Sequence, residues 1–215
     1  MNLFEDIPTY QITKIEESKG RGKYRILYLN GKKFGKFFDE IIFRFNIKED
    51  SFLNENELKQ LQKVQSEMEA EKIALNYLSY KPRSINEVKK KLFSKKIAYS
   101  VIDLTIEKMK KYGYLDDKKY ARDWIEERIR TRGFSPSKIK SELFLKGISK
   151  EIIENNLSEI FTPELEIKTA KRIAKKQMRK YKNLDEKVIK RRIINFLLRK
   201  GYNYSFIESI LSEVL

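Results

Sequence analysis

The 215-residue sequence contains neither cysteine nor histidine, and these two absences exclude much chemistry. Without cysteine there are no disulfides and no thiol nucleophile, which fits a reducing cytoplasm. Without histidine there is no zinc site built from the usual nitrogen and sulfur ligands, no Ser-His-Asp triad and no imidazole general base. We therefore expect a protein that is not an enzyme and that needs no metal or other cofactor.

Long apolar runs and phosphate-binding loops are missing as well. No segment approaches the roughly 18 apolar residues that a membrane helix needs, and the first ten residues lack the apolar stretch of a secretory signal. Glycines at Gly20, Gly22, Gly31 and Gly35 are placed as in hairpin turns, and no Walker-type loop follows them. We expect a cytoplasmic protein that does not contact membranes and does not hydrolyse nucleotides.

Positive charge is what the sequence has in excess. Lysine and arginine number 47 against 31 aspartates and glutamates, a net charge of +16 with a pI near 9.7. Residues 1–66 carry only +2 of this charge, and residues 67–215 carry +14. A lysine-rich surface can arise from genome bias alone, but this excess is larger than solubility requires. It predicts that the C-terminal part attracts polyanions.

The first fifty residues favour strands. Apolar residues alternate at Tyr24, Ile26 and Tyr28, and Asn30-Gly31 is a strong hairpin signal. The predicted elements are strands at Gln11–Glu16, Tyr24–Leu29 and Lys33–Phe38, a turn at Gly20-Arg21-Gly22, a short helix at Asp39–Asn46 and a polar stretch at Lys48–Glu57. This segment alone is too small to bury much apolar surface.

From about residue 56 the pattern becomes helical and repeats three times. The same spacing of apolar residues, with a lysine at one fixed position, runs from Val88 to Ile106, from Ile139 to Leu157 and from Ile193 to Leu211. The steps are 51 and 54 residues, without a gap inside the pattern. Such self-similarity predicts tandem repeats that are stabilised by stacking on their neighbours.

Each repeat is expected to hold three helices. The middle helix begins at the capping box Ser84-x-x-Glu87 in repeat one and at Ser135-Pro136 in repeat two. It ends through a left-handed glycine at Gly147 and at Gly201. Ser149 and Asn203 are expected to cap the third helices, and the first helices carry Ala74, Ala121 and Ala170, where small side chains allow close packing.

The predicted fold is therefore mainly α, with three tandem three-helix repeats in an elongated curved array after a small β-hairpin subdomain. We place the subdomain at 1–55 and the repeats at 56–115, 116–162 and 163–215. No heptad pattern persists long enough to indicate a coiled-coil oligomer, and a monomer is expected.

Two features that could carry chemistry have a structural interpretation. Asp116 and Asp117 are too few oxygen ligands for a divalent cation, and they fit an N-cap and a favourable charge at a helix start. Trp124, the sole tryptophan, falls at a core position of repeat two, so packing is favoured over base stacking.

Basic residues cluster along the repeats. On a helix, Arg128 and Arg132 share a face, as do Lys171 and Lys175, and such stripes bind phosphates without reading sequence. The alternative is a solvated surface with intrahelical ion pairs such as Arg122 with Glu126. We predict a basic face that comprises Lys81, Arg83, Lys91, Lys95, Arg122, Arg128, Arg130, Arg132, Lys138, Lys171, Arg172 and Lys175.

Three stretches carry a resemblance to a known family. Residues 74–92, ALNYLSYKPRSINEVKKKL, resemble the pattern A–YL–RPRS–EL–KL, with Lys81 where arginine is common. Residues 115–128, LDDKKYARDWIEER, resemble LDD–FA–W–R with Tyr120 in place of phenylalanine, and residues 138–148, KIKSELFLKGI, are similar to RI–EL–KGI. The chain thus resembles the RecX regulatory proteins over almost all of the repeat region and less distinctly over its N-terminal segment.

This resemblance implies a protein that binds the RecA–DNA filament, lying in its helical groove. There it would inhibit ATP hydrolysis and strand exchange and favour disassembly, in DNA repair, homologous recombination and the SOS response. The implied partners are the RecA filament and single- and double-stranded DNA bound without sequence preference. The alternative is a general basic nucleic-acid-binding protein, since three-helix units resemble helix-turn-helix modules.

Overall fold

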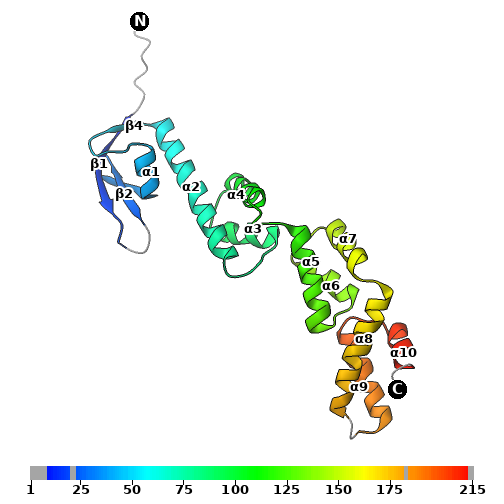
Figure 1. The fold of residues 1–215 in the computed structure, drawn as a ribbon. Helices are drawn as coiled ribbons and strands as arrows, with labels where there is room; N and C mark the ends of the chain where they lie inside the picture. The colour runs from blue at the N-terminus through cyan, green and yellow to red at the C-terminus, as the bar shows by residue number, and fades with distance from the viewer. Residues whose placement is uncertain (1–8, 20–22, 182–183, 213–215) are drawn as a thin grey trace. The chain divides into compact units, whose positions relative to one another are not determined.

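The computed structural model describes residues 9–19, 23–181 and 184–212. They form ten α-helices and an antiparallel sheet, which confirms the mainly helical class with an N-terminal β subdomain (Figure 1). The chain divides into two compact units, residues 1–76 with 92–105 and residues 77–91 with 106–215. No helix in the described ranges is both long and apolar enough to cross a membrane.

The N-terminal sheet has four strands in the order β3-β2-β1-β4. Its elements are β1 at Thr9–Glu17, β2 at Tyr24–Leu29, β3 at Lys32–Phe38, α1 at Asp39–Arg44 and β4 at Phe52–Asn54. The short β4, which pairs with the start of β1, was not predicted. Its three residues lie within a polar stretch and are too few to show the alternating apolar pattern of a strand. The predicted turn at Gly20-Arg21-Gly22 lies outside the described residues.

One face of this sheet is closed by helices. Ile12, Leu27 and Phe37 of the strands pack in one cluster with Ile41 of α1 and Leu61 of α2, the helix at Glu55–Leu78. The period of two along each strand places these apolar side chains on the inner face. The opposite face carries Tyr24 and Tyr28, which are only half-buried.

The repeats contain the helices that the sequence predicts. Repeat one consists of the C-terminal part of α2, α3 at Ile85–Ser94 and α4 at Tyr99–Lys111. Repeat two consists of α5 at Asp117–Glu127, α6 at Pro136–Leu145 and α7 at Lys150–Ile160, and repeat three of α8 at Pro163–Met178, α9 at Glu186–Arg199 and α10 at Tyr204–Leu211. The three alanines expected at close contacts, Ala74, Ala121 and Ala170, are fully buried.

The predicted caps are confirmed. Ser84 and Glu87 form the reciprocal capping box, with each side chain accepting the other residue's backbone N–H at 3.1 and 3.0 Å. Ser135, Ser149 and Asn203 each accept the N–H three residues further on. These bonds satisfy N–H groups that no helix turn can reach.

A π-helical turn, η1 at Arg128–Arg132, extends α5. Its hydrogen bonds run from i to i+5, so the α-helical spacing assumed for a shared face of Arg128 and Arg132 does not hold. A 3₁₀ turn, η2 at Arg179–Tyr181, extends α8 in a similar place. The first helices of repeats two and three therefore both end in an irregular turn.

Candidate functional site

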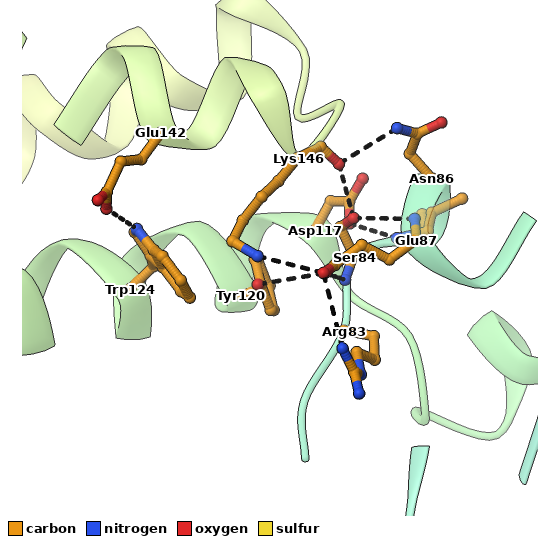
Figure 2. Close-up of polar contacts among 10 residues, drawn as sticks. Arg83, Ser84, Asn86, Glu87, Asp117, Tyr120, Trp124, Glu142 and Lys146 are labelled. Atoms are coloured by element: carbon orange, nitrogen blue, oxygen red, sulfur yellow. Dashed lines mark hydrogen bonds and ion pairs between the residues drawn. The ribbon is translucent and has the colours of Figure 1, made fainter. Parts of the chain in front are cut away.

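The repeats meet at joints in which the end of one middle helix lies on the start of the preceding one. At the first joint, the backbone carbonyl of Lys146, after α6, accepts hydrogen bonds from Ser84 Oγ at 2.7 Å and Asn86 Nδ2 at 3.4 Å (Figure 2). Ser84 caps α3 and Asn86 lies in its first turn. The last carbonyls of a helix lack partners within it, so these side chains supply them.

The second joint repeats this arrangement one repeat further on. The carbonyl of Lys200, after α9, accepts the backbone N–H of Ser135 at 3.0 Å, and the carbonyl of Gly201 accepts Ser137 Oγ at 2.9 Å. Ser135 and Ser137 stand 51 residues after Ser84 and Asn86. In both joints the negative end of one helix dipole faces the positive end of another.

Two glycines make the joints possible. Gly147 and Gly201 have φ of +78° and +91°, as predicted for left-handed helix exits. A Cβ atom on Gly147 would lie 2.5 Å from Asn86 Cβ, and one on Gly201 would lie 2.6 Å from Ser135 Oγ. Glycine is needed there for space as well as for backbone conformation.

Glu87 is the electrostatic centre of the first joint. Its carboxylate accepts Lys146 Nζ at 3.2 Å and Tyr120 Oη at 3.3 Å, besides the backbone N–H of Ser84 at 3.0 Å (Figure 2). Burial raises the pKa of Glu87, but the Ser84 N–H, the Lys146 ammonium and the nearby Arg83 outweigh it. The pKa of Glu87 therefore lies below its ordinary value, and the charged joint is favoured at neutral pH.

Asp117 adds a bond to the first joint that the second joint lacks. Its Oδ1 accepts the backbone N–H of Ile85 at 2.9 Å, and burial raises its pKa despite this bond. The equivalent acid in repeat three is Glu166, and the equivalent of Ile85 is Pro136, which has no N–H to donate. Burial raises the pKa of Glu166 as well.

Trp124 takes part in packing, as the sequence suggests. It packs against the core of repeat two while its Nε1 donates to Glu142 at 2.9 Å. Arg128 donates to the same carboxylate at 2.7 Å, pairs with Glu127, and lies 3.8 Å from the Trp124 ring. The Trp124 ring is thus covered by Arg128 and Lys146, whose charges are paired with Glu142 and Glu87.

The second joint is basic, with Glu127 as a carboxylate near Arg132: burial raises the pKa of Glu127, but Thr131, Arg128 and Arg132 together lower it. Burial lowers the pKa of Lys200, and the positive charges of Arg132 and Arg199 lower it further. Among the residues that the structure describes, no carboxylate forms an ion pair with Arg132, Arg199 or Lys200. Mutual repulsion of these cations favours an anion that would neutralise them.

Helix α8 carries further cations beside the second joint. Lys171, Arg172 and Lys175 line a shallow depression with Ile167. Arg172 donates to the backbone carbonyl of Ile129 in η1 at 2.8 Å, which fixes α8 against the π-helical turn. This group of predicted residues does come together.

The other predicted basic residues are distributed over several elements. Arg83 and Arg128 are mostly buried and paired with glutamates, and Arg122 lies 3.3 Å from both Glu126 and Glu159. Lys81 is exposed and lines a cleft with Arg83, and the Lys91 ammonium lies 5.5 Å from the Tyr77 ring. Three more are exposed on separate elements: Lys95, Arg130 and Lys138.

Sequence reasoning missed an exposed apolar position that recurs in each repeat. The leucine of the repeat pattern is fully buried at Leu92, Leu143 and Leu197, but the next residue is exposed: Phe93 by 55%, Phe144 by 69% and Leu198 by 43%. Successive residues of a helix point about 100° apart, and here only the leucine of the pair faces the core. The apolar pair alone did not reveal this, because the pair Val101 and Ile102 of the same pattern is buried at both positions.

Comparisons with known proteins agree with this architecture. Family models match residues 70–109, 116–157 and 164–211, described as the first, second and third three-helix domains of RecX. The chain is 30% identical to "Regulatory protein RecX" of Clostridioides difficile over 95% of both chains. It is 32% identical to the protein of that name from Finegoldia magna, over 93% of this chain and 97% of the relative.

Solved structures show the same fold. The "Crystal structure of regulatory protein RecX" superimposes with a TM-score of 0.67 and 28% identity over 94% of this chain and 99% of that one. The "Crystal structure of RecX from Lactobacillus salivarius" superimposes with a TM-score of 0.62 and 30% identity, over 70% of this chain and 97% of that one. With its three matched repeats and these relatives along nearly its whole length, the chain belongs to the RecX family of regulatory proteins.

Proposed function

We propose that this protein is a non-catalytic, cytoplasmic regulator that binds the RecA–DNA filament, inhibits its ATP hydrolysis and strand exchange, and promotes filament disassembly. Membership of the RecX family supports RecA as the partner. The observation that carries the proposal is the recurrence of one exposed apolar position and one joint in successive repeats. A filament of identical subunits presents equivalent sites at regular intervals, to which a repeat protein can bind in series.

The DNA contact is assigned to the second joint and α8. Arg132, Arg199 and Lys200 form no ion pairs among the described residues, whereas the cations of the first joint are paired with Glu87 and Glu142. Ammonium and guanidinium groups that contact phosphates bind single and double strands without reading bases. A monomer suffices for this contact.

The RecA contact is assigned to the recurring exposed position. Phe144 and Leu198 each follow a buried leucine near the end of a middle helix. Large apolar side chains contribute strongly when a partner covers them.

The test is RecA's single-stranded-DNA-dependent ATP hydrolysis, titrated with this protein at fixed salt. Inhibition well below the amount that coats the DNA would support filament regulation. Inhibition only at coating amounts would favour the alternative, a general basic nucleic-acid-binding protein built of helix-turn-helix-like units.

Phe144→Ser should weaken this inhibition about 10-fold or more, because a covered phenylalanine contributes roughly 1.5–3 kcal/mol. Leu145→Ser is the matched control, since Leu145 is 80% exposed on the same helix but Ser94 and Arg199 occupy its position in the other repeats. Equal effects of the two substitutions on inhibition would contradict the assigned contact.

A further inference from the structure

The outer face of the N-terminal sheet carries two half-buried tyrosine rings beside Phe38, which itself packs against the core cluster. Tyr28 stands between the buried Leu27 and Leu29 of β2 and so points to the opposite face. Tyr24 lies on this face too, with its ring centroid 4.6 Å from that of Phe38 on β3. Hydrogen bonding of Tyr28 Oη to Glu16 of β1, at 2.8 Å, confirms that β1 shares the face.

Lysines surround these rings. The Lys36 ammonium lies 4.4 Å from the Tyr24 centroid, and that of Lys72, from α2, lies 4.9 Å from Tyr24 and 5.3 Å from Phe38. Lys72 also donates to Tyr24 Oη at 3.0 Å. Within the described ranges, neither Lys36 nor Lys72 forms an ion pair with a carboxylate. Only Lys14, 5.9 Å from the Tyr28 ring, is neutralised, by Glu16.

Half-buried tyrosine rings interleaved with lysines that form no ion pair among the described residues fit one class of ligand. Single-stranded DNA offers base faces that stack on aromatic rings and phosphates that attract ammonium groups. Duplex DNA hides its base faces, so it could use only the lysines. The lysine stems are long enough to move the ammonium groups from the rings to phosphates when bases arrive.

We propose that this outer face, formed by Tyr24 and Tyr28 with Lys36 and Lys72, binds single-stranded DNA by base stacking. The proposal stands on the sheet and does not require that the repeats regulate RecA. Residues 1–66 carry a net charge of only +2, so electrostatic attraction to phosphates alone would not hold DNA on the sheet.

The test compares two oligomers of equal length and charge at one salt concentration, oligo(dT) and an abasic deoxyribose-phosphate chain. The full-length protein should bind oligo(dT) more tightly, and Tyr24→Leu with Tyr28→Leu should reduce this preference about 10-fold. Leucine preserves an apolar side chain on the sheet surface but removes the ring on which a base would stack. Phosphate contacts elsewhere treat both oligomers alike, so they leave the ratio unchanged.

The control is Phe43→Leu, which changes a ring that is 73% exposed on α1 and should preserve the preference. Lys36→Gln with Lys72→Gln gives a second variant, expected to weaken oligo(dT) binding and its salt dependence while the sheet stays folded by circular dichroism. Equal binding of oligo(dT) and the abasic chain by the unmodified protein would overturn the proposal, as would tighter binding of oligo(rU). RecA inhibition is measured in parallel, so failure of either proposal is seen separately.

Discussion

Lys96 has the same left-handed backbone as Gly147 and Gly201 but carries a side chain. Its φ is +61°, at the position of repeat one that aligns with the two glycines. No repeat precedes repeat one, and Lys96 is exposed. A side chain at position 96 therefore meets no neighbouring helix, and its left-handed backbone is the only source of strain.

Gly147→Ala should lower the free energy of unfolding by about 2 kcal/mol or more, because it adds left-handed strain and a clash with Asn86. Lys96→Gly should raise it by roughly 0.5–1 kcal/mol by relieving strain. Urea denaturation of both variants measures these changes. Destabilisation by Lys96→Gly would contradict the backbone strain assigned to Lys96, and an unchanged stability of Gly147→Ala would contradict the steric account of the glycines.

Glu166→Gln should stabilise the protein at neutral pH, because a partly buried carboxylate whose pKa is raised favours its neutral form. Because burial raises the pKa of Glu166, its negative charge destabilises the folded protein above the folded-state pKa. This destabilisation disappears below the ordinary value of 4.5, where Glu166 is protonated in both the folded and the unfolded protein. Melting temperatures should differ by about 1 °C or more at pH 7. A difference that persists at pH 3 would point to another cause.

At the scale of elements, the first joint should behave as a coupled unit. Glu87→Gln keeps the capping box but removes the charge that Lys146 contacts, and Lys146→Met keeps the aliphatic stem. A double-mutant cycle should give a coupling of about 1 kcal/mol or more, since both side chains are about one-fifth exposed.

Because the pKa of Glu87 is lowered, this contribution is present above 4.5 and is lost as the pH falls through the folded-state value. The exposed pair of Lys140 and Glu154, 2.8 Å apart, is the comparison and should couple by less than about 1 kcal/mol. Equal couplings at pH 7 would argue against a special role for the joint.

Sequence predicted the helical repeats and their caps because both follow from local rules. Helix starts are predictable from side chains that can cap them, as Ser84, Ser135 and Asn203 do. The helical spacing of apolar residues likewise predicts that Leu143 is buried. The pairing of β4 with β1 and the π-helical turn at Arg128 depend on contacts between distant residues or on a rare hydrogen-bond pattern. The joints could be inferred only in part, since the glycines were visible but not their partner helices.

At the scale of the whole molecule, net charge overstates the surface that can bind phosphates. Many cations of the repeats are held by carboxylates, as Arg83, Arg122 and Arg128 are. The cations of the second joint are, by contrast, close enough to repel one another. Affinity for DNA should therefore depend on few side chains rather than on the total of +16.

Arg132→Ala and Lys200→Ala should each weaken DNA binding for every sequence and reduce the slope of log affinity against log salt by about 1. Arg122→Ala should leave the slope nearly unchanged, because Glu126 and Glu159 already neutralise Arg122. Fluorescence anisotropy over a range of salt concentrations measures the slopes. An effect of Arg122→Ala as large as that of Arg132→Ala would rule out the second joint as the preferred contact.

The side chain of Lys96 also has a consequence for solutions of many molecules. A middle helix that ends in glycine can dock on the start of another, and among the described residues no helix end hydrogen-bonds to the start of α9. Two copies of the chain could therefore join end to end and grow into open chains, as unclosed head-to-tail contacts do. A side chain at position 96 would clash where Gly147 and Gly201 fit, so we expect Lys96 to oppose this head-to-tail docking between copies.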